Sequence, residues 1–261
     1  MLTSLHERFA TLLFGIGETG WLAAESVKSV LGGRVRWRLV LQQILDVGYA
    51  SQVVVLTTGA FTGAVFTAQV YFQFRTLGME SAVGPVVAVA LFRELGPVLT
   101  GLMVAGRVGA AMSAEIGTMR VTQQIDALRA LAVNPVDYLV VPRALAMFVS
   151  MPLLALECVV CGIAASYFVA AHVLGMETVY FLANMVKYTG TSDIAMTLVK
   201  GFFFAGIVVF ISCREGFAVK KGAVGVGRAT TRAVVFCSMT ILVFNFFLSM
   251  ALNIIFPAGA R

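Results

Sequence analysis

Five runs of apolar residues, each about 20 residues or longer, constrain what this chain can fold into. A helix of that length crosses the hydrocarbon core of a bilayer. Only 12% of the residues are charged, the apolar share is 59% and the mean hydropathy is +0.92, whereas soluble domains carry about 25% charged residues. In lipid, a helix satisfies all of its own backbone groups. The sequence therefore predicts an all-α membrane protein with spans at about 47–74, 83–108, 144–174, 194–212 and 231–256.

The N-terminal segment has a different pattern. Residues 2–16 place their apolar side chains on one helical stripe and polar side chains on the other, which predicts an amphipathic helix at the membrane interface. A cleaved signal peptide is the alternative, although a basic start and a small-residue cleavage site are lacking. Gly32-Gly33 should end the helix, and a basic cluster surrounds Trp37. We therefore divide the chain into an interfacial unit, 1–38, and a transmembrane domain, 39–261.

The basic residues indicate the orientation. Of the 19 Lys and Arg residues, Arg93 and Lys200 lie within predicted spans, and Arg75, Lys187 and Arg261 lie on one side. The other 14 lie on the opposite side, since 19 minus 2 minus 3 is 14. Because Lys and Arg accumulate in cytoplasmic loops, this bias predicts a cytoplasmic N-terminus and a C-terminus outside.

The second span carries adjacent charges. Arg93 and Glu94 lie roughly 15 Å deep if the helix starts near Gly84, and ionisable groups at that depth normally face a cavity or a partner. Neighbouring residues on a helix do not face one another. We expect each to have a separate partner, such as a polar ligand group or a cavity water, and we expect the helix to weaken or bend at Gly96-Pro97.

A polar, amphipathic segment follows this span without a break. The pattern predicts one helix over about 113–130, with Ser113 as its N-cap and Asn134-Pro135 after its end. Such a helix between two spans could dock on a soluble partner. Alternatively, it rests on the bilayer surface.

The C-terminal half of the first span mixes bulky apolar side chains with amides at helical spacing. Ordinary helix packing and a wall for an amphipathic ligand both explain the pattern. Upstream, Gly59-x-x-x-Gly63 would let another helix approach closely. The mixed face consists of Phe66, Gln69, Val70, Gln73, Phe74 and Leu77.

Motifs for hydrolysis are missing from the sequence. It has no GxxxxGK[ST] phosphate loop, no HExxH and no GxSxG, so we expect no ATP hydrolysis by this chain itself. Cys158-x-x-Cys161 has no metal-ligand partners nearby and reads as helix packing. Deep ionisable residues also include Glu157, Asp193 and Lys200, which leaves an ion-coupled secondary transporter as an alternative function.

Two long motifs resemble a known family. RELGPVLTGLMVAGRVGAAMSAEIGTMRVTQQIDAL, followed by AVNP, closely resembles the core signature of MlaE-type permeases. Asp193 and Lys200 ahead of GFFFAG, then GVGRATTRAV, resemble a second block of the same family. These permeases are the membrane subunits of MCE-associated phospholipid ABC transporters. The likeness covers nearly the whole chain.

The resemblance implies partners and a function. It implies a homodimer in the cell inner membrane, bound to a cytoplasmic ABC ATPase dimer that uses ATP and magnesium, with no cofactor in this chain. A STAS-domain regulator on the ATPase and a periplasmic MCE-domain hexamer are also implied. The cargo would be glycerophospholipid, moved between inner and outer membranes to maintain outer-membrane lipid asymmetry. A small-solute ABC importer permease is the nearest alternative.

The resemblance also nominates site residues. A lipid cavity at the dimer centre would be lined by Arg93, Glu94 and Leu95 together with the mixed face of the first span. One departure is Glu157, where the family is apolar; Glu157 could pair with Lys200, line a side cavity or stay protonated. The helix that couples to the ATPase would contribute Glu115, Ile116, Met119, Arg120, Gln123, Gln124 and Asp126.

Overall fold

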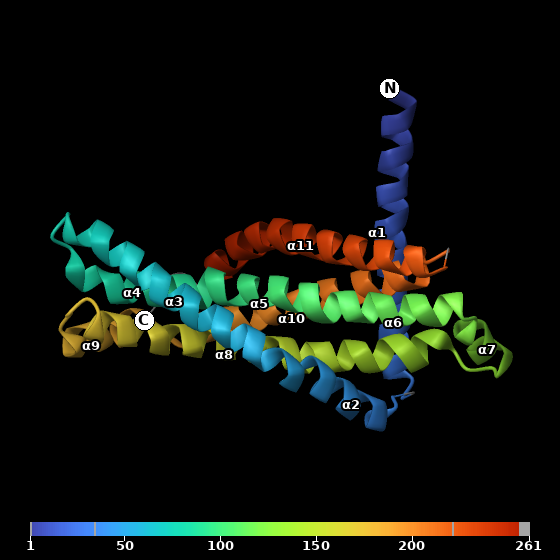
Figure 1. The fold of residues 1–261 in the computed structure, drawn as a ribbon, viewed down its shortest axis with the longest axis horizontal. Coiled ribbons are helices and arrows are strands. Elements are labelled where there is room, and N and C mark those ends of the chain that lie inside the picture. The colour runs from blue at the N-terminus through green and yellow to red at the C-terminus, as the bar shows by residue number, and fades with distance from the viewer. Residues whose placement is uncertain (1, 34, 221, 256–261) are drawn as a thin grey trace.

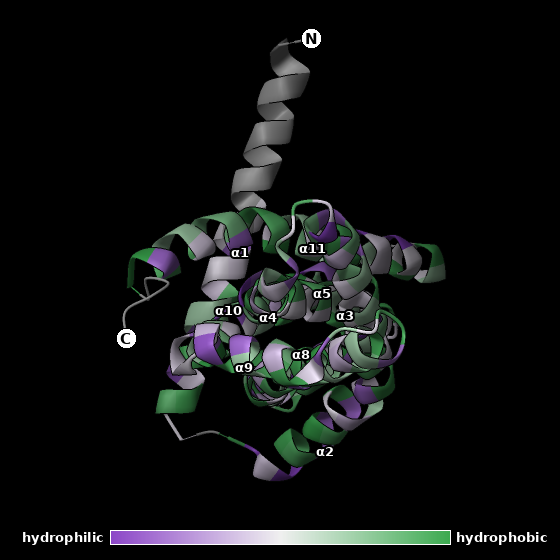
Figure 2. Cartoon of the chain, turned by 90° about the vertical axis from the view of Figure 1, so that its left-hand side faces the viewer, coloured by the Kyte–Doolittle hydropathy of each residue, from purple (hydrophilic) through white to green (hydrophobic). Residues whose placement is uncertain are grey.

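The computed structural model describes residues 2–33, 35–220 and 222–255, and within them it contains helices and no strand. Five helical stretches are long and apolar enough to cross a membrane, as the sequence predicted. They lie side by side in one bundle (Figure 1). Seen along the bundle in Figure 2, hydrophobic residues are spread over its outer faces. The stretches are Trp37–Arg75, Glu80–Val121, Val136–His172, Thr191–Phe217 and Gly222–Ile255.

The helix α1 (Leu2–Leu31) runs across one end of the bundle rather than along it (Figure 1). It is twice as long as the segment that the amphipathic pattern indicated, and its side chains 1–14 and 16 lie outside the described residues. The helix ends at Leu31, where Gly33 adopts a positive φ of 70°, so the predicted break at Gly32-Gly33 is confirmed. A transverse helix at the end of a bundle is what an interfacial element requires.

The first span begins earlier than predicted. Helix α2 (Trp37–Val47) and a 3-10 turn, η1 (Tyr49–Ser51), precede α3 (Gln52–Arg75). Val40 and Val47 are buried against the bundle, while Trp37 is exposed at the start of α2. The division proposed after residue 38 therefore falls inside α2. In the sequence, the arginines around Trp37 look like part of a connecting segment.

The other spans also begin earlier or end later than predicted. The second span is assembled from α4 (Val83–Ala90), η3 (Leu91–Leu95), α5 (Gly96–Val104), η4 (Ala105–Gly109) and α6 (Ala110–Val121). The third joins η5 (Val136–Val140) to α8 (Val141–His172). At the opposite end from α1, α9 (Thr178–Tyr188) covers the connection to the fourth span. The last two spans are α10 (Thr191–Phe217) and α11 (Gly222–Ile255).

The predicted helix over 113–130 is divided in two. Ser113 is not an N-cap but lies buried inside α6, which continues the second span to Val121. Gln123 then adopts a left-handed conformation with φ 60°, and α7 (Gln124–Ala130) follows. The single-helix prediction was wrong, because a positive φ at glutamine carries no signal comparable to that of glycine.

Glycines bring α3 and α8 into direct backbone contact. A Cβ added at Gly63 would lie 2.2 Å from the Gly162 carbonyl oxygen, and one at Gly59 would lie 2.4 Å from that of Cys158. Ser166 Oγ also donates a hydrogen bond to the Gly63 carbonyl at 3.0 Å. The close approach indicated by Gly59-x-x-x-Gly63 is confirmed, and the partner helix is α8.

The close contact between α3 and α8 leads to a prediction about stability. Gly63→Ala should lower the free energy of unfolding by about 1–3 kcal/mol, because the new methyl group pushes two backbones apart. Gly106→Ala is the matched control, since nothing lies within 4 Å of its Cβ position. Thermal unfolding of both variants in the same detergent checks the difference, and equal melting temperatures would contradict the proposed packing.

Candidate functional site

The second span opens into a π-helical turn, η3, at its charged residues. The Gly96 N–H bonds to the carbonyl of Leu91, five residues back, instead of the α-helical partner. Pro97 follows and has no N–H to donate to the carbonyls of Phe92 or Arg93. The irregularity expected at Gly96-Pro97 is thus present, in the form of a π turn.

The fourth span supplies donors to these two carbonyls. Thr197 Oγ1 donates to the Phe92 carbonyl at 2.6 Å, and Lys200 Nζ donates to the Arg93 carbonyl. Both donors are fully buried. Side chains from α10 therefore donate to both carbonyls at this turn, and one of these bonds replaces the backbone bond that Pro97 cannot make.

Arg93 and Glu94 each have a separate ionic partner on α10. Arg93 Nε lies 2.6 Å from Asp193 Oδ1, and Lys200 Nζ lies 3.0 Å from Glu94 Oε1. Asp193 Oδ2 also accepts a hydrogen bond from the Gly190 N–H at 2.8 Å. The expectation of separate partners is confirmed, but these partners are protein side chains and not a ligand or a water.

The last span completes this network through residues that sequence reasoning missed. Asn245 Nδ2 donates to Glu94 at 2.8 Å, Lys200 Nζ donates to Ser249 Oγ at 2.7 Å, and Arg93 Nη1 donates to Asn253 at 2.8 Å. The three recur at every fourth residue on one face of α11. A polar stripe at that spacing in an otherwise apolar span was the available signal.

A hollow of about 1090 Å³ lies beside the network, toward the α9 end. Arg93, Glu94 and Asp193 face it from one side, and the α9–α10 connection forms another wall. Of the nine nominated lipid residues, Arg93 and Glu94 line this hollow and the other seven do not. Among the acidic and basic side chains of the network, that of Glu94 is the most accessible: 41% of it is exposed, against 0% for Lys200.

The nominated residues of the first span divide into two groups. Phe66, Val70 and Phe74 are half-buried and pack, with Leu95, against the cluster around Leu91 and Tyr71. The amides point away from that cluster and are exposed, and Leu77 is 63% exposed in the turn after α3. Helix packing and an open face are therefore both present, on different sides of α3.

Glu157 does not pair with Lys200, because the ammonium group of Lys200 forms an ion pair with Glu94. Its Oε1 accepts a long hydrogen bond of 3.5 Å from Gln52 Nε2. Its buried Oε2 has no hydrogen-bond partner among the described residues. The pairing with Lys200 raised from the sequence is ruled out.

The nominated coupling residues also separate by burial. Ile116 is fully buried under Gly216 and cannot reach a partner protein, and Met119 packs against the core. Glu115 forms an ion pair with Arg143 of α8 at 2.8 Å, so it ties α6 to the third span. Glu115 nevertheless stays 55% exposed on α6. The other exposed residues lie around α7: Gln123, Gln124 and Asp126, with Arg120 half-buried and 3.0 Å from Asp126.

The family comparison matches the region that holds the network. The model described as "Permease MlaE" covers residues 40–251, which include the second, third and fourth spans and most of the first and fifth, and every network residue named above except Asn253. The chain belongs to the MlaE permease family. A probable ABC transporter permease protein of Rickettsia bellii is 41% identical over 94% of this chain and 95% of its own length.

Further relatives extend beyond one bacterial group. A probable ABC transporter permease protein of Synechocystis is 40% identical over 87% of its length and 88% of this chain. Protein TRIGALACTOSYLDIACYLGLYCEROL 1, chloroplastic, of Arabidopsis thaliana is 39% identical, over 87% of this chain and 65% of its own length. This MlaE family member is thus a membrane-embedded permease subunit, and an ABC permease works with an ATPase partner.

The buried ion pairs of this permease predict an asymmetric response to two similar substitutions. Asp193→Asn leaves the buried Arg93 guanidinium without a counter-charge and should cost about 3–5 kcal/mol of stability. Asp126→Asn, in an exposed pair at 3.0 Å from Arg120, should cost less than about 1 kcal/mol. Thermal unfolding of the two variants gives the comparison. A similar small loss for both would mean that Asp193 contributes no more than a surface charge.

Proposed function

We propose that this MlaE family member moves glycerophospholipid, as a homodimer driven by a partner ATPase. The observation that carries the proposal is the exposed face of α3, where Val65 and Phe72 alternate with the amides of Gln69 and Gln73. Acyl chains need apolar walls, and a head group needs a few polar contacts. Because Arg93 and Glu94 are already neutralised within the chain, the amides are the first polar groups that a lipid on this face would meet.

The uncovered spans support a dimer. Only 22% of the apolar window in the first span and 17% of that in the last span are buried, against 44–50% in the other three. A second copy seated on the α3 face would close it into a central cavity and would shield the amides from the hydrocarbon of the surrounding bilayer. Phe66, Val70, Phe74 and Leu95 would then form the supporting layer behind the cavity wall.

The cargo class is supported by the resemblance and by one relative's name. The Arabidopsis relative is named after a galactosylated diacylglycerol, which is a two-chain membrane lipid. We therefore favour lipid over a small solute. The rest of the proposed assembly comprises the cell inner membrane, a periplasmic MCE-domain hexamer, a STAS-domain regulator and a role in outer-membrane lipid asymmetry.

Coupling to the ATPase is assigned to α7. This short helix lies at the same end of the bundle as α1 (Figure 1), the end that the charge bias assigns to the cytoplasm. Gln123, Gln124 and Asp126 are exposed there, so a docked ATPase could touch them, together with the exposed Glu115 at the neighbouring part of α6. ATP and magnesium would be held by that partner. Movement of α7 would reach the α3 face through α6 and the second span.

A test of the lipid cavity uses two exposed positions. Gln69→Trp should reduce co-purified phospholipid, because the indole fills the α3 face, and Val160→Trp on the outer surface of α8 should leave it unchanged. We expect about a tenfold loss for Gln69→Trp if the blocked site is specific. Mass spectrometry of lipid extracted from matched preparations measures it. Equal lipid in both would mean that the bound lipid is annular.

A second test disrupts α7, which also contributes the buried Ile125 to the core. Ala127→Pro removes the Ala127 N–H bond to the Gln123 carbonyl, 3.0 Å in length, and proline inside a helix costs about 3 kcal/mol. We expect a lower melting temperature, with the membrane domain still folded, and loss of co-purification with the ATPase. Ala127→Ser is the control. Intact assembly and transport in the proline variant would remove α7 from the coupling path.

A further inference from the structure

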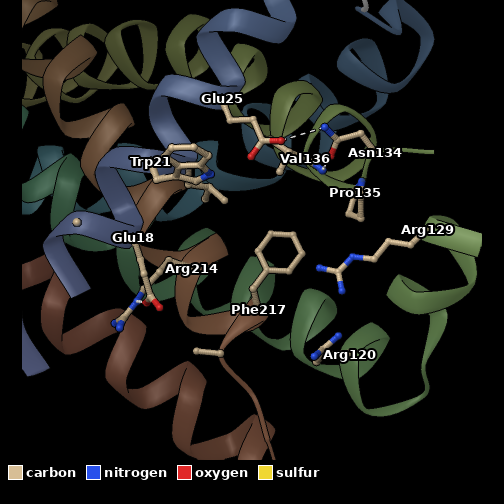
Figure 3. Close-up of a pocket in the computed structure, with 13 residues that line it drawn as sticks. Glu18, Trp21, Glu25, Arg120, Arg129, Asn134, Pro135, Val136, Arg214 and Phe217 are labelled. Atoms are coloured by element: carbon tan, nitrogen blue, oxygen red, sulfur yellow. Dashed lines mark hydrogen bonds and ion pairs between the residues drawn. The ribbon is translucent and has the colours of Figure 1, made fainter. Parts of the chain in front are cut away.

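A second hollow, of about 1070 Å³, lies at the α7 end of the molecule (Figure 3). Helix α1 forms one wall, the ends of α6 and α7 form another, and the end of α10 closes the third side. The segment Asn134–Val136 lies between them. None of the nominated lipid residues lines this hollow, so it is separate from the proposed transport route.

The acidic groups of this hollow already have partners. Glu18 accepts a hydrogen bond from Arg214 Nε at 3.0 Å, and Glu25 accepts one from Asn134 Nδ2 at 3.0 Å. Arg214 also pairs with the buried Glu215, which in turn lies 3.2 Å from Arg232 of α11. These contacts fix α1 to the bundle. Arg214 and Arg232 offset the charges of Glu18 and Glu215, whereas Glu25 is held by a neutral amide and keeps its charge on the α1 wall.

The basic groups are in excess at the opposite wall. Arg120 Nη1 and Arg129 Nη1 share a single carboxylate oxygen, Asp126 Oδ1, at 3.0 and 3.2 Å. Two guanidinium groups against one carboxylate leave one positive charge, and most of their N–H donors make no contact with Asp126. Figure 3 shows the Arg129 side chain extending from α7 into the hollow, toward Phe217. The chemistry of this wall suits an anion with several acceptor oxygens, such as a phosphate group.

The remaining walls are apolar and lie at the membrane interface. Trp21 and Leu22 of α1 face the hollow together with Phe217, and Trp21 is 74% exposed. Tryptophan is enriched at the level of lipid head groups. Since α1 crosses the end of the bundle (Figure 1), the hollow opens where the head groups and upper acyl chains of a leaflet lie. A soluble anion would have no use for these apolar walls.

We propose that this hollow binds an acidic phospholipid of the surrounding leaflet, with its phosphate at Arg120 and Arg129 and its glycerol and upper acyl chains against Trp21 and Phe217. The bound lipid bridges α1 to α7. The inference does not rest on the proposed cargo, because it concerns a different hollow and holds for a permease of any substrate.

The two tryptophans allow a direct test. Trp37→Phe leaves Trp21 as the sole tryptophan of the full chain, and the protein is then reconstituted in vesicles that contain phosphatidylcholine with either brominated phosphatidylglycerol or brominated phosphatidylcholine. We expect stronger quenching of Trp21 by the acidic lipid at equal mole fraction. Equal quenching by the two brominated lipids overturns the proposal.

Matched charge variants locate the site. In the Trp37→Phe background, Arg129→Gln should weaken the acidic-lipid preference about fivefold, which corresponds to one basic residue at a lipid surface. Arg228→Gln removes the same charge from an exposed position on α11 and should leave the preference unchanged. Equal effects of the two variants would mean general surface attraction and would overturn the site.

Two further measurements distinguish a bound lipid from the other possible occupants of the hollow, a free anion and a protein segment. Soluble glycerol 3-phosphate should not relieve the quenching; if it does so at millimolar concentration, the hollow takes a free anion and the lipid assignment is wrong. If Arg129→Gln keeps the lipid preference and lowers co-purification of the ATPase instead, the hollow receives a protein segment. Unchanged melting temperatures of the variants show that the fold is intact in each comparison.

Discussion

The two carbonyl groups next to Pro97 impose a requirement on the rest of the membrane domain. A span in hydrocarbon has no water to satisfy Phe92 and Arg93, so another helix must supply donors. Thr197 and Lys200 do so from α10. Lys200 brings a charge into the interior, and Glu94 neutralises it at 3.0 Å. Hydrogen bonds to the backbone and ion pairs thus together fix the depth and rotation of the fourth span against the second.

The sequence predicted the elements of this arrangement better than their pairing. Apolar run length is set by bilayer thickness, so all five spans could be found, and Arg93, Glu94, Asp193 and Lys200 stood out because charges are rare at that depth. Their pairing depends on how two helices are rotated and offset. Neither quantity is encoded locally, and the π turn at η3 shifts the angular spacing of adjacent residues. The donors on α11 went unnoticed because amides and hydroxyls are common enough in spans to look like packing.

The region after the second span was harder to predict for a different reason. Its polar residues fit one exposed amphipathic helix, yet Ile116 is buried and Glu115 pairs with Arg143, because α6 continues the bundle. An ion pair between spans and a surface charge look alike in a sequence. Once the break at Gln123 is known, the proposed coupling surface consists of the short α7 and the exposed side chains at the end of α6.

The charge network also limits which parts can move during transport. Breaking a buried ion pair leaves an uncompensated charge and costs several kcal/mol. We therefore expect η3, α10 and the polar face of α11, with Asn245, Ser249 and Asn253, to move as one body. Helix α3 is attached differently, through glycine backbone contacts and apolar packing to α8. Sliding two packed helix surfaces past each other costs less free energy than separating a buried ion pair. In the proposed dimer, the cavity between the two copies would therefore change shape at α3, while the paired charges keep the second span at constant depth.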